Sequence, residues 1–188
     1  SEEWLVVDSK VEDLGVLLSG LEDGVRVFEV SDGGQATELI SRALCNTALA
    51  RLHLLGHGEP GLIRFGDDWL GAEAFSSLIP LDRQGVLQIN FWSCRTGAGD
   101  RGREFVSKVA EVTKSIVSAS TNLIGHEEMG GTWDLDVMGL PRSPFSAEAR
   151  RQFRQVMIRG GLTTVYYNAD AVGGVGTFGS PYGKDQVS

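Results

Sequence analysis

Two short stretches of the sequence decide the fold: LHLLGHG at residues 52–58 and INFWSC at residues 89–94. Each is an apolar run of strand length that ends at a residue able to carry chemistry, His57 in the first and Cys94 in the second. Apolar runs of this kind are typical of strands that are buried on both faces of a parallel sheet. The two stretches therefore predict two buried strands whose carboxyl ends carry His57 and Cys94.

The rest of the chain alternates between strand-like and helical segments. The expected strands are residues 4–7, 25–30, 52–55, 86–92 and 115–119. The expected helices are residues 12–21, 35–48, 72–78, 100–113 and 147–157, with Asp100 and Ser146 as the N-caps of the last two. This alternation predicts an α/β fold, a three-layer αβα sandwich with a mostly parallel central sheet.

Three segments depart from the alternation. Residues 62–70 and 125–137 have the pattern of β-hairpins. Residues 162–167 have the composition of a last strand, and a glycine-rich stretch follows them. We therefore expect one α/β domain over residues 1–160, and a possible last strand with a flexible tail or linker over residues 161–188.

The charge and hydrophobicity of the chain exclude several classes of partner. The 188 residues carry a formal net charge of -8 and contain no run of Lys and Arg, so we expect no nucleic-acid partner. No apolar run is long enough to span a bilayer, and no signal peptide is recognised at the start, so membrane insertion is not expected.

The cysteines and histidines give no metal or disulfide pattern. The chain has two cysteines, Cys45 and Cys94, so a disulfide framework is not expected. Cys45 is predicted to lie on the buried face of the helix at residues 35–48. The two cysteines and three histidines lack the spacing of a metal site, so we expect no metal and no cofactor, and dependence on calcium stays open.

The two strand ends predict a nucleophilic site. Ligands of such sheets gather beyond the carboxyl ends of the strands, and neighbouring strands lie roughly 4.8 Å apart. His57 could then assist formation of the Cys94 thiolate, while the backbone N–H groups of Gly58 and Cys94 form an oxyanion hole. The alternative is that Cys94 is a core residue, since cysteine is among the most buried residue types.

Three motifs carry a resemblance to a known family. They are HLLGHGEPG at residues 53–61, FWSCRTGAGDRG at residues 91–102 and GGTWDLD at residues 130–136. The chain from residue 4 to 137 resembles an uncharacterised bacterial domain family. Its members commonly sit near the start of very large exported or surface proteins with cadherin-like or calcium-binding repeats.

The strand-His-Gly and strand-Cys arrangement is also similar to that of the caspase, legumain, clostripain and gingipain superfamily. The resemblance implies a caspase-like fold, with His57 as catalytic base, Cys94 as nucleophile, and Gly58 and Cys94 as the oxyanion hole. Substrate-cleft candidates by the same resemblance are Trp92, Ser120, Trp133 and Asp134. The alternative interpretation is that Trp133 is a packed aromatic residue and that Asp134 is a carboxylate in a turn. Trp92 and Ser93 before the cysteine depart from the superfamily pattern and leave substrate preference open.

The resemblance implies a hydrolase: a thiol protease that acts as an endopeptidase through a thioester, with autoprocessing of its own parent chain. The expected partner is a polypeptide substrate, and the expected location is secreted or on the bacterial cell surface. One alternative is a catalytically inactive caspase-like module for binding or assembly within a surface protein. Another is a different thiol hydrolase or an acyltransferase.

Overall fold

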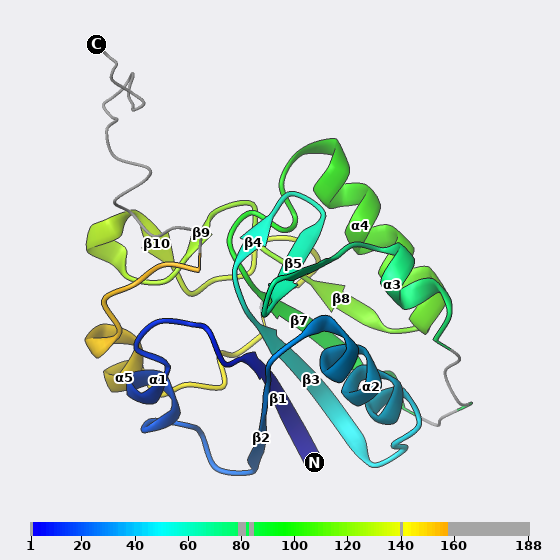
Figure 1. The fold of residues 1–188 in the computed structure, drawn as a ribbon, viewed down its shortest axis with the longest axis horizontal. Helices are drawn as coiled ribbons and strands as arrows, with labels where there is room; N and C mark the ends of the chain where they lie inside the picture. Colours follow the sequence, from blue (N-terminus) through cyan, green and yellow to red (C-terminus); the bar gives the residue numbers. More distant parts are fainter. Residues whose placement is uncertain (1, 79–81, 83–84, 140, 158–188) are drawn as a thin grey trace. The chain divides into compact units, whose positions relative to one another are not determined.

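Five parallel strands form the central sheet of the computed structural model, in the order β2-β1-β3-β7-β8 (Figure 1). Their bounds are β1 Glu2–Asp8, β2 Val25–Val30, β3 Leu49–Leu55, β7 Gln88–Trp92 and β8 Ile116–Ser118. Because β1, β3 and β7 lie inside the sheet and are covered on both faces, their sequences are apolar runs rather than alternating patterns. The predicted parallel sheet is confirmed.

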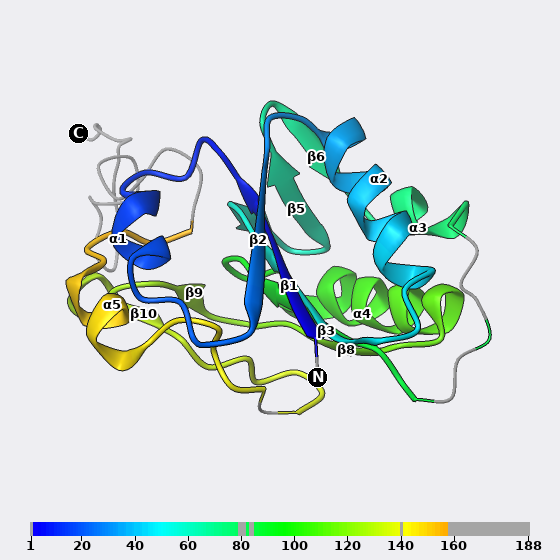
Figure 2. The same cartoon turned by 90° about the horizontal axis from the view of Figure 1, so that it is seen from below.

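Helices cover both faces of this sheet (Figure 2). The bounds are α1 Leu14–Leu18, α2 Gly33–Leu44, α3 Glu73–Ser76, α4 Gly99–Thr113 and α5 Ala147–Gln152. Helices α2, α3 and α4 lie on one face, while α1 and α5 pack together on the other. The architecture is the expected three-layer αβα sandwich.

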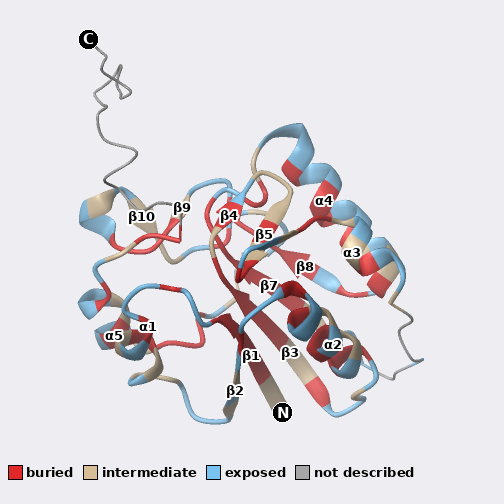
Figure 3. Cartoon of the chain, viewed as in Figure 1, coloured by how far each residue is buried: buried red, intermediate tan, exposed pale blue. Residues whose placement is uncertain are grey.

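The inner strands β1, β3 and β7 are buried along most of their length, whereas the edge strand β2 is largely uncovered (Figure 3). On the face covered by α3 and α4, Phe75, Phe91 and Phe105 meet edge to face with ring centroids 5.0–6.1 Å apart. On the face covered by α1 and α5, Trp133 contacts Trp92 and other rings of a second aromatic cluster. Aromatic pairs of this kind add roughly 0.5–1.5 kcal/mol each beyond the area they bury. The rings on both faces thus help to hold the sheet rigid beneath the loops.

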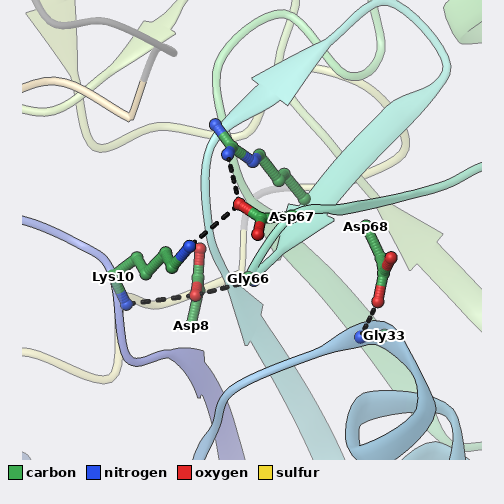
Figure 4. Close-up of polar contacts among 7 residues, drawn as sticks. Asp8, Lys10, Gly33, Gly66, Asp67 and Asp68 are labelled. Atoms are coloured by element: carbon green, nitrogen blue, oxygen red, sulfur yellow. Dashed lines mark hydrogen bonds and ion pairs between the residues drawn. The ribbon is translucent and has the colours of Figure 1, made fainter.

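A small antiparallel sheet lies beyond the carboxyl ends of β1 and β3. It consists of β4 Gly58–Glu59, β5 Leu62–Phe65 and β6 Asp68–Leu70, and it confirms the hairpin predicted at residues 62–70. Asp8, buried at the end of β1, holds the turn between β5 and β6, because its Oδ1 accepts a 3.0 Å hydrogen bond from the N–H of Gly66 (Figure 4). Because β4 begins at Gly58, this hairpin also holds the loop that carries His57.

The hairpin predicted at residues 125–137 is not formed. Strands β9 Leu123–Ile124 and β10 Gly131–Thr132 pair in parallel, and the short 3-10 helix η1 Glu127–Met129 lies between them. Gly130 ends η1 in the left-handed region, with a φ of 83°, and β10 then runs in the same direction as β9. The prediction missed this helix, and the strand direction was therefore wrong.

Three further details of the helices differ from the prediction. The N-cap of α4 is Ala98, and Asp100 lies in its first turn. Helix α5 ends at Gln152, five residues before the predicted end. Cys45 follows α2 as its C-cap and is exposed. The predicted cap of α5 is confirmed, because Oγ of Ser146 accepts a 3.1 Å bond from the N–H of Ala149.

The structure describes residues 2–78, 82, 85–139 and 141–157. The chain up to Met157 is one compact unit. The last strand predicted at residues 162–167 and the glycine-rich tail lie outside the described residues. Within the described part, none of the helices has the length and apolar character needed to cross a membrane.

Candidate functional site

The register of the central sheet brings His57 and Cys94 to the same level. Strands β3 and β7 are parallel neighbours, and Leu55 pairs with Trp92. His57 and Cys94 each follow two residues later. The N–H of Gly56 still donates to the carbonyl of Trp92 at 3.5 Å, so the two chains remain side by side as they leave the sheet. The two residues therefore share one edge of the sheet.

The backbone of Gly58 packs directly on the backbone of Cys94. A Cβ atom on Gly58 would lie 2.5 Å from the carbonyl oxygen of Cys94 and 2.8 Å from its nitrogen. Any residue other than glycine would push the two loops apart. The carbonyl of half-buried His57 accepts a 2.9 Å bond from the N–H of Arg64, so the hairpin holds this loop in place.

The turn after Cys94 is fixed by side-chain hydroxyls and by an unusual backbone conformation. Oγ of Ser93 and Oγ1 of Thr96 lie 2.6 Å apart, and Oγ1 of Thr96 donates to the carbonyl of Leu62 at 3.0 Å. Arg95 has a φ of 57°, in the left-handed region that few residues other than glycine adopt. Strained backbone of this kind persists where the surroundings enforce it and clusters at functional sites.

Two backbone donors at the site converge on a single carbonyl. The N–H of Gly58 donates to the carbonyl oxygen of Met157 at 3.1 Å, and the N–H of Cys94 donates to the same oxygen at 3.3 Å. These are the two groups that the sequence predicts as an oxyanion hole. In the structure they hold a peptide carbonyl that comes from the chain itself.

The segment that supplies this carbonyl runs as an extended strand. The N–H of Met157 donates to the carbonyl of Ile124 at 2.8 Å, and the carbonyl of Gln155 accepts a 2.9 Å bond from the N–H of His126. Gly125 and Val156 between them form an antiparallel bridge. A Cβ atom on Gly125 would lie 2.3 Å from the carbonyl oxygen of Gln155, so glycine permits this close approach.

The thiol of Cys94 is buried beside the same segment. Its Sγ atom accepts from the N–H of Ile124 at 3.2 Å and lies 3.6 Å from the carbonyl oxygen of Ile124. That oxygen is also the acceptor for the N–H of Met157. Burial raises the pKa of the Cys94 thiol to about 12, and the hydrogen bond to Ile124 and the charge of Arg95 offset only part of this rise. The thiol is therefore protonated at neutral pH while this arrangement persists.

The four cleft candidates are divided between the interior and a neighbouring pocket. Trp92 is fully buried, its indole N–H donates to Nδ1 of His53 in the sheet, and its ring packs against Trp133. Ser120 is buried, and its Oγ accepts a 2.9 Å bond from the N–H of Asn122. Trp133 and Asp134 line a surface pocket of about 560 Å³.

This pocket adjoins the extended segment without containing His57 or Cys94. It is bounded by Gly125 and His126 on one side and by residues of α5 on the other. The ring of Trp133 also packs against Phe145 and Phe153, at centroid separations of 5.7 and 5.9 Å. Trp133 is thus a packed aromatic residue at the base of the pocket, and the acid at 134 is exposed.

The sequence prediction missed a second polar group on the same pair of strands. His53 is fully buried in the middle of β3, where its Nε2 lies 3.0 Å from Oε1 of Glu3 and its Nδ1 accepts a 3.0 Å bond from the indole N–H of Trp92. The amide of Asn90 lies 3.4 Å from the same Nδ1. The available signal was a polar residue inside each of two otherwise apolar strands, His53 in β3 and Asn90 in β7.

The extended segment was also missed, and here no local signal marks it. The predicted helix over residues 147–157 runs through Phe153, Val156 and Met157, whose spacing suits a buried helical face. In the structure all three are buried, but the last two belong to the strand-like segment. Pairing with residues 124–126 outweighs the local preference for helix.

Among the described residues, no group of three or more His, Cys, Asp or Glu side chains is arranged to hold a metal ion. The site thus consists of an imidazole, a thiol, two converging N–H groups and a bound peptide strand. The chain is thus an αβα sandwich protein that carries a histidine and a cysteine beyond the ends of two neighbouring parallel strands. The chain belongs to the family described as Domain of unknown function (DUF4347), whose model matches residues 4–157. No curated protein and no solved structure matches it.

Proposed function

We propose that this protein is a cysteine endopeptidase in which His57 and Cys94 form the catalytic dyad. The observation that carries the proposal is the convergence of the Gly58 and Cys94 N–H groups on one carbonyl oxygen, at 3.1 and 3.3 Å. An oxyanion hole needs two such donors beside the nucleophile. Here one of the donors belongs to the nucleophile itself.

In the proposed reaction, His57 takes the proton from Sγ of Cys94, and the thiolate attacks the carbonyl carbon of the scissile peptide. The negative charge that develops on the carbonyl oxygen is stabilised by the N–H groups of Gly58 and Cys94. His57 then protonates the departing amine, and a thioester remains on Cys94. Water attacks the thioester with His57 as base, which releases a carboxylate and restores the thiol.

The buried thiol makes the role of His57 essential in this proposal. With a pKa of about 12, the Cys94 thiol cannot ionise at neutral pH without a nearby base. Transfer of the proton to an imidazole held at the same sheet edge removes this barrier. The resemblance of the two motifs to the caspase, legumain, clostripain and gingipain superfamily supports the same roles. By the same resemblance we propose a secreted or cell-surface location within a larger bacterial protein, with polypeptide as the substrate.

The test is hydrolysis of any peptide bond by the full 188-residue chain, in itself or in an added pool of peptides, followed by mass spectrometry. We expect hydrolysis by the unaltered chain and by Cys45→Ala, which removes the exposed cysteine. Cys94→Ala should lose it, and His57→Gln should reduce it about 10³-fold. Hydrolysis by Cys94→Ala at the rate of the unaltered chain would overturn the dyad.

One observation favours a second candidate function, a catalytically inactive module for binding or assembly. The thiol is fully buried, and both proposed oxyanion donors are already bonded within the chain. A site closed in this way could serve only to anchor the extended segment. Absence of any hydrolysis by the unaltered chain, in itself or in the pool, would favour this module and remove the peptidase.

A further inference from the structure

The occupant of the proposed oxyanion hole is the chain's own segment Gln155–Met157, and its path is that of a bound peptide. Helix α5 ends at Gln152, and Phe153 then anchors the chain in the aromatic cluster. From Gln155 onward, the backbone pairs antiparallel with residues 124–126 through bonds of 2.8 and 2.9 Å. Addition of an extended peptide to the edge of a sheet is a common mode of peptide recognition.

The reacting atoms of such a peptide are specified by these contacts. Met157 donates its N–H to Ile124 and places its carbonyl oxygen between the two N–H donors. The thiol of Cys94 contacts the same Ile124 peptide through both its N–H and its carbonyl. The carbonyl of Met157 is therefore polarised, and one of its two donors is the N–H of the proposed nucleophile residue itself. In a peptidase, the carbonyl in this position is the one that is attacked.

The side chains of the segment indicate which residues the site accepts. Met157 is 0% exposed and Val156 is 3% exposed. Gln155 is only half-buried, and exposed Arg154 forms an ion pair with Glu128 at 3.1 Å. The position on the amino side of the polarised carbonyl thus receives a long, unbranched apolar side chain that is fully buried. A charge at this position would have to be buried, which is costly.

We propose that the protein cleaves its own chain between Met157 and Ile158, and this inference rests on the proposed function. Sγ of Cys94 forms a bond to the carbonyl carbon of Met157, its proton passing to His57. The bond from Met157 to the nitrogen of Ile158 breaks as His57 returns that proton to the nitrogen. One water then hydrolyses the thioester and leaves a carboxylate on Met157 and the thiol on Cys94.

The segment is tethered to the body of the fold, so the reaction is intramolecular. Helix α5 is capped by Ser146 and packs against α1, and it leads into the segment within the same compact unit. The tether holds the scissile carbonyl against the N–H of Cys94 and lowers the entropic cost of bringing the peptide to the thiol. The residues shared with the family, 4–157, end at the same methionine.

The experiment uses the full chain, kept at two protein concentrations tenfold apart in heavy-oxygen water, with intact-mass analysis over time. We expect fragments 1–157 and 158–188, one heavy oxygen in the carboxylate of Met157, and the same first-order rate at both concentrations. Cys94→Ala should give no fragments. Cleavage at another bond, or a rate that rises with protein concentration, would overturn the inference.

A pair of substitutions tests the apolar position. Met157→Leu should cleave within about threefold of the unaltered rate, and Met157→Asp should cleave at least about tenfold more slowly. The matched control is Met138→Asp, because Met138 is 62% exposed, has a φ of 65° that aspartate tolerates, and should leave the rate unchanged. Equal rates for Met157→Asp and Met157→Leu in folded protein would overturn the inference.

Hydrolysis of the added peptide pool distinguishes the inference from the proposed function. If Cys94-dependent hydrolysis of the pool occurs while the chain stays intact, the peptidase stands and self-cleavage at Met157 is wrong. If neither the chain nor the pool is cut, both fail. If Met157→Asp misfolds, the position of the cut and the heavy-oxygen label in the unaltered chain still decide the inference.

Discussion

His53 and His57 lie four residues apart, His53 within β3 and His57 two residues beyond its end. His53 pairs in register with Asn90 in the middle of the sheet, whereas His57 and Cys94 lie beyond its edge. Both ring nitrogens of His53 have partners inside the protein. The loop of His57 is instead bounded by glycines and leads directly to two N–H groups that hold a peptide carbonyl.

The hydrogen bonds of His53 show that its role is structural. Trp92 donates to Nδ1, so the ring proton resides on Nε2, which donates to Glu3. Burial lowers the pKa of His53, and the hydrogen bond and charge of Glu3 offset this only in part. The hydrogen bond from His53 in turn lowers the pKa of Glu3. The pair is thus a neutral imidazole bonded to a carboxylate, rather than two opposite charges. The two histidines differ in role because His53 lies within the sheet and His57 lies beyond its edge.

The largest expected difference between the two histidines is in peptide hydrolysis. His57→Gln should reduce the cleavage rate of the chain about 10³-fold, because the thiol loses its base. His53→Gln should change the rate less than about fivefold in protein that remains folded. The rates are measured by intact mass at one temperature, with folding checked by circular dichroism. An equal loss in both variants would show that the two histidines do not differ in role.

The second largest difference is in stability. His53→Ala should lower the free energy of unfolding by about 3 kcal/mol, because it leaves a cavity and takes the buried hydrogen-bond partner from the indole of Trp92. His57→Ala should cost less than about 1 kcal/mol, because its ring is only half-buried. Urea unfolding is followed in the Cys94→Ala background so that the chain stays intact. A larger loss for His57→Ala would reverse the comparison.

The sequence predicts the position of the site better than its contents. The apolar runs before His57 and Cys94 are sufficient for a parallel sheet, and adjacent strands in register bring the two residues together. Side-chain alternation along β7 could also have placed Trp92 with His53 on the far side of the sheet. The bound segment at Gln155–Met157 could not be found in this way. Its conformation depends on pairing with residues 124–126, about 30 residues earlier, rather than on its own pattern.

The closed site should also distinguish the two cysteines. In the His57→Gln chain, iodoacetamide at neutral pH should modify Cys94 at least about tenfold more slowly than Cys45. Cys94 is buried with a raised pKa, whereas Cys45 is exposed at the end of α2. The rates are read from the masses of the two cysteine peptides after quenching and digestion. Equal rates would mean that the segment at Gln155–Met157 does not cover the thiol.

The smallest expected effect is the pH dependence that His53 confers on stability. Its pKa is lowered in the folded state, so above pH 6.5 the ring is neutral in both states and the stability is complete. As the pH falls below 6.5, the unfolded chain binds a proton that the folded chain excludes, and stability is lost at up to about 1.4 kcal/mol per pH unit. The free energy of unfolding of the Cys94→Ala chain in urea should therefore be lower at pH 5.5 than at pH 7.0, by at most about 1 kcal/mol. The difference should shrink when His53→Gln is added, and an unchanged difference in that variant would place the effect on another group.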